Sequence, residues 1–130
     1  MREKILVVED DPAALRLVTF TLESAGYKVI PAANGIEGLR KAQEEQPDLL
    51  VLDLMLPGID GYEICHRLRS NSAGPGSRLP ILMLTAKSQQ ADRTMAEQVG
   101  VDLYLSKPVT PEEITAAVHS LLSHRQEEHA

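Results

Sequence analysis

Acidic side chains stand at the ends of two short apolar segments. Glu9 and Asp10 follow the segment Ile5–Val8, and Asp53 follows Leu49–Leu52. Carboxylates about 5 Å apart at an effective dielectric of 20 repel each other by roughly 3 kcal/mol per pair. A group formed by these three acids therefore needs protons or a cation. Mg²⁺ (or Mn²⁺) is the predicted cofactor, because it prefers oxygen ligands and often binds carboxylates together with a phosphate.

A hydroxyl and an ammonium group stand at two further segment ends. Thr85 follows Ile81–Leu84, and Lys107 comes shortly after Leu103–Leu105. Both groups can bind phosphate oxygens, the hydroxyl as a hydrogen-bond donor and the ammonium as a point charge. Asp53 stands alone at the end of its segment, which makes it the predicted nucleophile. The combination favours phosphoryl transfer onto a carboxylate, which depends on in-line placement and charge neutralisation.

These side chains meet if the apolar segments are strands of one parallel sheet. The runs that begin at Ile5, Leu49 and Ile81 are continuously apolar, which is typical of strands buried on both faces. Ligands of open parallel sheets bind beyond the carboxyl ends of the strands, where the polar residues stand. The predicted strands are Ile5–Val8, Val29–Ile30, Leu49–Leu52, Ile81–Leu84 and Leu103–Leu105.

Helical spacing occupies the stretches between these segments. Leu15, Val18 and Leu22 recur at i, i+3 and i+7, which predicts an amphipathic helix. Five strands that alternate with five helices predict an α/β, doubly wound parallel sheet with right-handed crossovers. The other helical stripes are Ala91, Met95 and Val99, and then Ile114, Ala117, Val118, Leu121 and Leu122.

Local signals mark where these helices begin and end. Asp11 precedes Pro12, as an N-cap precedes a proline at the first helical position, and Thr110 to Glu113 reads as a capping box. Weaker start signals are Asn34 with Glu37 and Asp60 with Glu63, and Gly26 and Gly100 stand where helices should end.

Composition limits the classes of protein to consider. The 130 residues suffice for one domain, and 43% of them are hydrophobic, enough to build a core. Lys and Arg against Asp and Glu give 13 − 19 = −6, which argues against direct nucleic acid binding. No apolar run approaches the ~18 residues of a membrane span. Cys65 is the single cysteine, which fits a reducing, cytoplasmic location.

Four segments resemble the receiver domains of two-component response regulators. They are LVVEDD (Leu6–Asp11), LLVLDLMLPGIDGYE (Leu49–Glu63), ILMLTAK (Ile81–Lys87) and DLYLSKP (Asp102–Pro108). The resemblance covers the chain from Lys4 to about Leu122 and implies a flavodoxin-like fold with strand order 2-1-3-4-5. We expect residues 1–123 to form the receiver domain and 124–130 to be a polar tail or the start of a linker.

The resemblance also implies roles for the residues at the strand ends. Asp53 would be the phosphoacceptor, taking a phosphoryl group from the phosphohistidine of a sensor histidine kinase or a phosphotransfer protein. Asp10 and Asp53 would bind Mg²⁺ directly, together with the backbone carbonyl of Met55, and Glu9 would bind it through water. Lys107 would pair with the phosphoryl group, and its bond to Pro108 would be cis.

The family's switch maps onto a second set of positions. Thr85 and Tyr104 would form the switch pair, with Thr85 drawn toward the phosphoryl group and the Tyr104 ring entering the vacated space. The surface of the fourth helix, fifth strand and fifth helix would then change for a downstream protein partner or effector domain. Met55 and Lys87 stand where the family tunes the lifetime of the phosphorylated state.

The charges for a phosphorylation-driven homodimer through that surface are only partly present. Receivers that dimerise there carry interlocking charges, which Arg93, Asp102 and Glu113 fit. Leu103 and Ala117 stand where further charges are expected. Leu103 could instead belong to an apolar patch for another partner.

Three other classes of protein are alternatives to a receiver domain. A haloacid-dehalogenase-type enzyme would need a second Asp two residues after Asp53, where Met55 stands. A flavodoxin-like electron carrier would need a Ser/Thr-rich loop after the first strand, where acids would repel a flavin phosphate. A degenerate receiver, acting only as a binding module, would lack site residues that this chain retains. A self-catalysing phosphoacceptor signalling domain, and not an enzyme acting on a separate substrate, is therefore the predicted function.

Overall fold

A computed structural model describes residues 2–71, 73–74, 76–86 and 90–129. Five parallel strands form one sheet in the order β2-β1-β3-β4-β5, which confirms the predicted doubly wound α/β fold. In chain order the elements are β1 Lys4–Val8, α1 Pro12–Ser24, β2 Lys28–Ala32, α2 Gly35–Glu44, β3 Leu49–Asp53, α3 Gly61–Ser70, β4 Ile81–Thr85, α4 Gln90–Gln98, β5 Leu103–Ser106 and α5 Pro111–His129.

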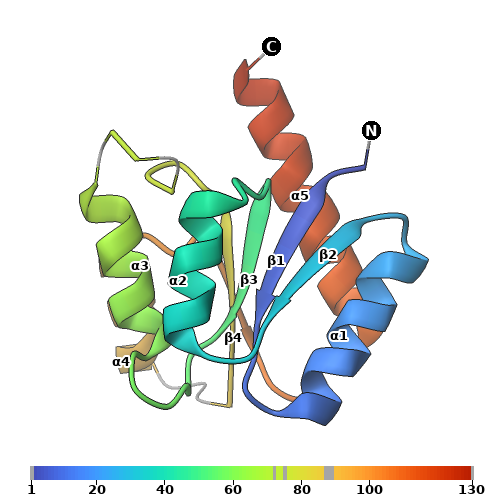
Figure 1. Ribbon diagram of the computed structural model, residues 1–130, viewed down its shortest axis with the longest axis horizontal. Helices are drawn as coiled ribbons and strands as arrows, with labels where there is room; N and C mark the ends of the chain where they lie inside the picture. Colours follow the sequence, from blue (N-terminus) through green and yellow to red (C-terminus); the bar gives the residue numbers. More distant parts are fainter. Residues whose placement is uncertain (1, 72, 75, 87–89, 130) are drawn as a thin grey trace.

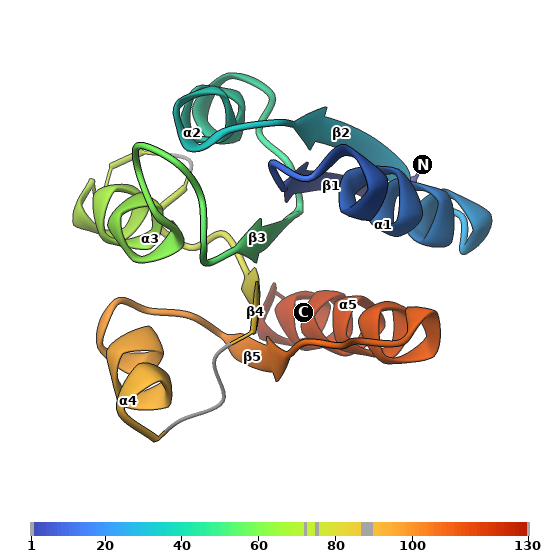
Figure 2. The same ribbon diagram turned by 90° about the horizontal axis from the view of Figure 1, so that it is seen from below.

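Helices cover both faces of the sheet. Helices α1 and α5 lie on one face, and α2, α3 and α4 lie on the other (Figures 1 and 2). Successive strand residues point to opposite faces, so β1 sends Ile5 and Val7 toward α1 and α5, and Leu6 and Val8 into the opposite cluster. Strands β3 and β4 are buried along their whole length, as their continuously apolar sequences predict.

The predicted helix starts are confirmed. The Asp11 and Asn34 side chains accept hydrogen bonds from the backbone N–H groups of Ala14 (3.2 Å) and Glu37 (2.8 Å). Asp60 caps α3 in the same way, through the N–H of Glu63 at 2.9 Å. The capping box is reciprocal, since Glu113 N–H donates to Thr110 Oγ1 and Thr110 N–H donates to Glu113 Oε1. Gly26 and Gly100 follow α1 and α4 with φ of 99° and 91°.

Two helices differ in detail from the sequence patterns. The predicted α4 stripe is only partly buried, because Met95 is exposed while Val99 is half-buried against the core, and the neighbouring Ala96 is buried instead of Met95. Helix α5 continues to His129, so the polar segment from His124 to His129 is helical. Among the helices of the described residues, none is both long and apolar enough to cross a membrane.

Candidate functional site

The sheet brings the four polar strand ends to one edge. Parallel registers align Val8 of β1 with Leu52 of β3, and Asp53 with Leu84 of β4. Thr85 then lies beside Ser106 of β5. Figure 2 looks along the strands from below, with the loops that follow β1 and β3 toward the viewer. The predicted convergence of these segment ends is therefore present in the structure.

Glu9, Asp10 and Asp53 form a compact group of carboxylates. One carboxylate oxygen from each lies within 4.8 Å of the others. Glu9 is 5% exposed and Asp53 6%, whereas Asp10 is open to solvent. Oxygen donors from closely spaced acids suit a hard divalent cation such as Mg²⁺ or Mn²⁺. The residues present therefore fit the predicted metal.

Lys107 reaches this group from the loop after β5. Its Nζ lies 3.2 Å from Glu9 Oε1 and 3.4 Å from Asp53 Oδ2. Its backbone N–H donates to the Thr85 carbonyl at 2.6 Å, and the Lys107–Pro108 peptide is cis, as predicted. Burial disfavours the charged form, but the charges of Asp53 and Glu9 outweigh it and raise the pKa of Lys107 above its ordinary value.

Glu9 is the acid whose ionisation this site resists. Burial raises the pKa of Glu9, and a hydrogen bond with Asp53 and the Asp53 charge raise it further. The Asp11 backbone N–H and the Lys107 charge act in the opposite direction but do not cancel the increase. The geometry thus agrees with the electrostatic argument that these acids need added positive charge.

Backbone contacts orient the central carboxylate. The Met55 N–H donates to Asp53 Oδ1 at 3.3 Å, while the exposed Met55 side chain lies at the rim. Gly61 begins α3 directly against this strand end, since a Cβ there would lie 3.1 Å from the Asp53 carbonyl oxygen and 3.0 Å from Leu54 Cα. Gly61 is not among the predicted site residues. Its position eight residues after Asp53 was the available signal.

Thr85 and Tyr104 lie on neighbouring strands. Thr85 ends β4 and is buried, and Tyr104 in β5 is half-buried and packs against the α2–α3 side of the core. Tyr104 is in register with Met83, two residues before the pairing of Thr85 with Ser106. Lys87, the other predicted tuning residue besides Met55, lies outside the described residues.

Comparisons with known proteins place the chain in a family. A family model described as the response regulator receiver domain matches residues 5–119. The alkaline phosphatase synthesis transcriptional regulatory protein PhoP of Bacillus subtilis (strain 168) is 45% identical over 122 residues, covering 94% of this chain and 49% of that protein. This chain belongs to the response regulator receiver domain family.

Further relatives extend the match to solved structures. The DNA-binding response regulator MtrA of Mycolicibacterium smegmatis is 38% identical and covered to 55% of its length, so the chain spans about half of the regulators it matches. Vibrio cholerae chemotaxis protein CheY4 superposes with a TM-score of 0.87 at 32% identity, over 93% of this chain and 99% of that one. The receiver domain of the Pseudomonas aeruginosa sensor histidine kinase PA1611, solved with magnesium in its active site cleft, has a TM-score of 0.85 at 33% identity, over 95% and 99%. Family membership sets aside the dehalogenase and electron-carrier interpretations.

Two of the charges suggested for a dimer face of this receiver are engaged within the chain. The Asp102 carboxylate pairs with Arg69 at 2.9 Å and accepts the Ile81 N–H at 2.7 Å. Glu113 is part of the α5 capping box. Ala117 is buried in the core, so it cannot contribute to a surface patch with the half-buried Leu103. The Arg93 side chain lies outside the described residues.

Proposed function

We propose that this receiver domain accepts a phosphoryl group onto Asp53 from the phosphohistidine of a sensor histidine kinase or a phosphotransfer protein. The observation that carries the proposal is the position of the buried Asp53 carboxylate. It lies beside two other acids and close to the Lys107 ammonium, where the strands end. An Asp53 oxygen attacks phosphorus, the bond from phosphorus to the imidazole nitrogen breaks, and the imidazole keeps the electron pair. The product is an acyl phosphate on Asp53.

This chain's own groups supply the positioning that such a transfer needs. The Met55 N–H on Oδ1 fixes the rotation of the Asp53 carboxylate, and Lys107 near Oδ2 offsets negative charge that the phosphoryl group brings. Thr85, at the end of the adjacent strand, offers a hydroxyl donor to the same group. Because the chain holds these groups itself, it promotes its own phosphorylation and dephosphorylation.

A divalent cation completes the site. Asp10 and Asp53 would hold Mg²⁺ (or Mn²⁺) together with the Met55 carbonyl, and Glu9 would bind it through water. The bound ion would neutralise charge on the carboxylates and the phosphoryl oxygens. The pKa of Glu9, raised first by burial and then by Asp53, agrees with this assignment, because a cation here would favour the charged forms of both acids.

Phosphorylation would switch the surface formed by α4, β5 and α5. A phosphoryl group adds strong acceptors and about −1.5 to −2 charges. We infer that Thr85 moves toward it and that the Tyr104 ring follows into the space released. Shifting such an equilibrium from 1:99 to 99:1 needs about 5.5 kcal/mol of differential interaction, which new charge-assisted hydrogen bonds to Thr85 and Lys107 can supply. Met55 and Lys87 would tune the lifetime of the phosphorylated state.

The relatives support a proposal for what the switched surface acts on. Several of them are named as transcriptional regulators about twice as long as the matched segment. We propose that residues 1–123 are the receiver unit, that residues 124–130 are a polar tail or the start of a linker, and that the switched surface acts on an effector domain or a separate protein. The free thiol of Cys65 supports a cytoplasmic location.

Intact mass measurement tests the proposed chemistry. Incubation with acetyl phosphate and Mg²⁺ should add one phosphate to the wild type and none to Asp53→Asn. Asp60→Asn is the matched control, because asparagine also caps a helix and Asp60 lies outside the acid group. Beryllofluoride binding should likewise require Mg²⁺. Labelling of Asp53→Asn at the wild-type level, or no labelling of the wild type, would refute the proposal.

A further inference from the structure

Helix α2 approaches the end of β1 through a glycine. Gly38 is buried and lies against Val8, the last residue of β1. A Cβ atom at position 38 would lie 2.6 Å from Val8 Cγ2 and 2.9 Å from Val8 Cγ1, well inside the distance at which carbon atoms pack. The glycines with positive φ are Gly26, Gly58 and Gly100. At Gly38, therefore, the close approach of β1 and not the backbone conformation excludes a side chain.

The close approach lowers the stability of the helix itself. Gly38 lies inside α2, which runs from Gly35 to Glu44. Glycine in a helix interior is less favourable than alanine, because it loses more backbone freedom on folding. Helix α2 therefore gives up stability at a position where it lies against the end of β1.

Val8 connects this contact to the acidic group. It is buried and in register with Leu52 of β3. Glu9 and Asp10 follow Val8 directly in the chain, whereas Asp53 follows Leu52 on the neighbouring strand. A shift of Val8 relative to β3 therefore moves Glu9 and Asp10 relative to Asp53.

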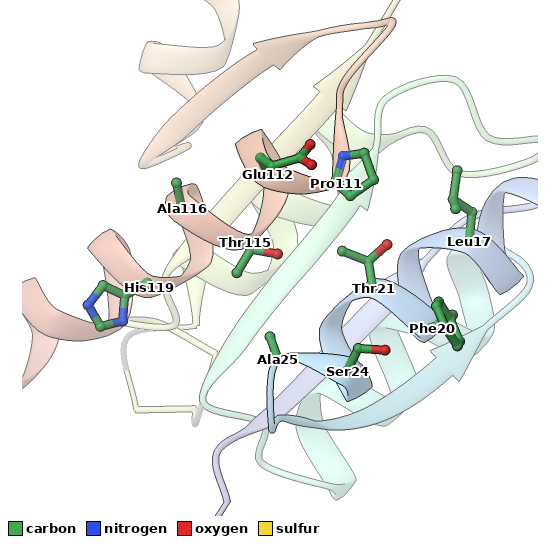
Figure 3. Close-up of a pocket in the computed structure, with 10 residues that line it drawn as sticks. All are labelled: Leu17, Phe20, Thr21, Ser24, Ala25, Pro111, Glu112, Thr115, Ala116 and His119. Carbon is green, nitrogen blue, oxygen red and sulfur yellow. The ribbon is translucent and has the colours of Figure 1, made fainter.

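The opposite face of the sheet gives β1 no room to move away from α2. Val7, the neighbour of Val8, packs on that face among the buried residues beneath α1 and α5. Figure 3 shows these two helices, which border a groove of about 740 Å³. No strand residue lines this groove, so it provides no free volume for β1. A side chain at position 38 would therefore change the contact between α2 and the end of β1.

We propose that Gly38 is a positioning residue for the cation site formed by Glu9, Asp10 and Asp53. This inference rests on the Mg²⁺ site of the proposed function. One oxygen of each acid lies within 4.8 Å of the others, and Mg²⁺ demands near-octahedral geometry with ligand distances of about 2.0–2.1 Å. Because Gly38 lets α2 pack directly on Val8, it holds the two acids that follow β1 at this separation from Asp53.

Titration with Mg²⁺ in the absence of a phosphoryl donor, followed by amide chemical shifts, tests the proposal. Gly38→Ala should raise the Mg²⁺ dissociation constant about tenfold or more, as the loss of groups that orient metal ligands typically does. Alanine favours the helix, so an effect confined to α2 would stabilise the helix and leave Mg²⁺ binding unchanged. Gln43→Ala is the matched control, because it raises helix propensity at an exposed position of α2, and it should bind Mg²⁺ as the wild type does.

Val8→Ala is the complementary variant. It removes the two methyl groups that the methyl group of Gly38→Ala would meet. On its own, Val8→Ala should weaken Mg²⁺ binding, because a cavity replaces the contact between β1 and α2. Adding Gly38→Ala should then strengthen Mg²⁺ binding, since its methyl group refills that cavity. The same substitution thus acts in opposite directions in the two backgrounds, which a general loss of stability would not produce.

The possible outcomes separate this inference from the proposed function. Wild-type Mg²⁺ affinity in Gly38→Ala, or a loss of affinity that Val8→Ala does not reverse, would overturn the role of Gly38. If Gly38→Ala does not fold, the comparison of Val8→Ala with the double variant decides alone. A wild type that binds no Mg²⁺ would instead refute the cation site on which the inference rests.

Discussion

Arg69 and Asp102 join the end of α3 to the start of β5, with Arg69 Nη2 2.9 Å from Asp102 Oδ2. The same guanidinium donates to the carbonyl of Gly100 at 2.7 Å and to that of Leu79 at 2.7 Å. Asp102 in turn accepts the Ile81 N–H at the start of β4. These two side chains therefore link the α3–β4 loop, the α4–β5 loop and the starts of β4 and β5.

Arg69→Met should destabilise the fold by about 2–3 kcal/mol, because hydrogen bonds to charged groups contribute about 1.5–3 kcal/mol and the partly exposed partners can recover some of this from water. The urea midpoint measures the effect. Arg67→Met is the matched control, since Arg67 makes an exposed i, i+4 pair with Glu63 that contributes at most about 0.5 kcal/mol. An equal loss of stability in the two variants would show that the contacts of Arg69 between segments stabilise the fold no more than an exposed ion pair does.

Features that depend on neighbouring residues could be predicted from the sequence. The N-cap of α1 at Asp11 and the capping box at Thr110 follow from side chains and backbone N–H groups within one turn. The strand at Leu49 follows from an apolar run too continuous for a half-exposed strand. The shared edge for Asp53 and Lys107 follows from the parallel direction of the strands.

Features that depend on distant segments could not be predicted. The carbonyls that Arg69 binds come from two loops, and no local sequence pattern predicts that both loops turn toward α3. Asp102 fits the charge pattern of a dimer surface, but it forms an ion pair with Arg69 of the same chain. The helical pattern around α4 does not tell whether Met95 or Ala96 faces the core. The packing of α4 on the sheet decides that Ala96 is buried. The placement of Lys107 Nζ between two acids likewise needs the loop geometry.

Glu9 gives the metal-free site a distinct pH dependence. Its pKa in the folded state is raised above the ordinary value of 4.5, chiefly by burial and then by Asp53. The folded state therefore binds this proton more tightly than the unfolded state, and the resulting stability is present below pH 4.5 and lost as pH rises through the raised pKa. Glu9→Gln cannot ionise, so in EDTA at pH 7 it should unfold at a higher urea concentration than the wild type. The difference should vanish below pH 4.5, and a constant difference across pH would contradict the assignment.

Cys65 should be inert in the folded protein. Burial raises the pKa of the Cys65 thiol to about 12, so no thiolate is available near neutrality. We expect no reaction with an aromatic disulfide reagent at pH 8, and complete reaction in urea. Ser70→Cys is the control, because position 70 is exposed on the same helix and its thiol should react at once.

The pKa of Cys65 in the folded state lies above the ordinary 9.0, so the stability of the fold should decline as pH rises from 9 toward 12. Rapid native-state labelling of Cys65 would show that α3 opens readily.

Removal of Lys107 should leave phosphorylation of Asp53 intact but weaken the conformational change that follows it. Asp53 keeps its orienting Met55 N–H when Lys107 is removed, so Lys107→Ala should still acquire one phosphate from acetyl phosphate. The variant lacks the ammonium that lies between Asp53 and Glu9, and the phosphoryl charge then has one fewer partner to hold it in the switched geometry. Amide chemical shifts of β5 and α5 on adding beryllofluoride and Mg²⁺ should therefore change far less than in the wild type. Lys41→Ala, which breaks an ion pair with Glu37 on α2, should respond fully. A full response in Lys107→Ala would show that the Thr85 hydroxyl suffices to drive the switch.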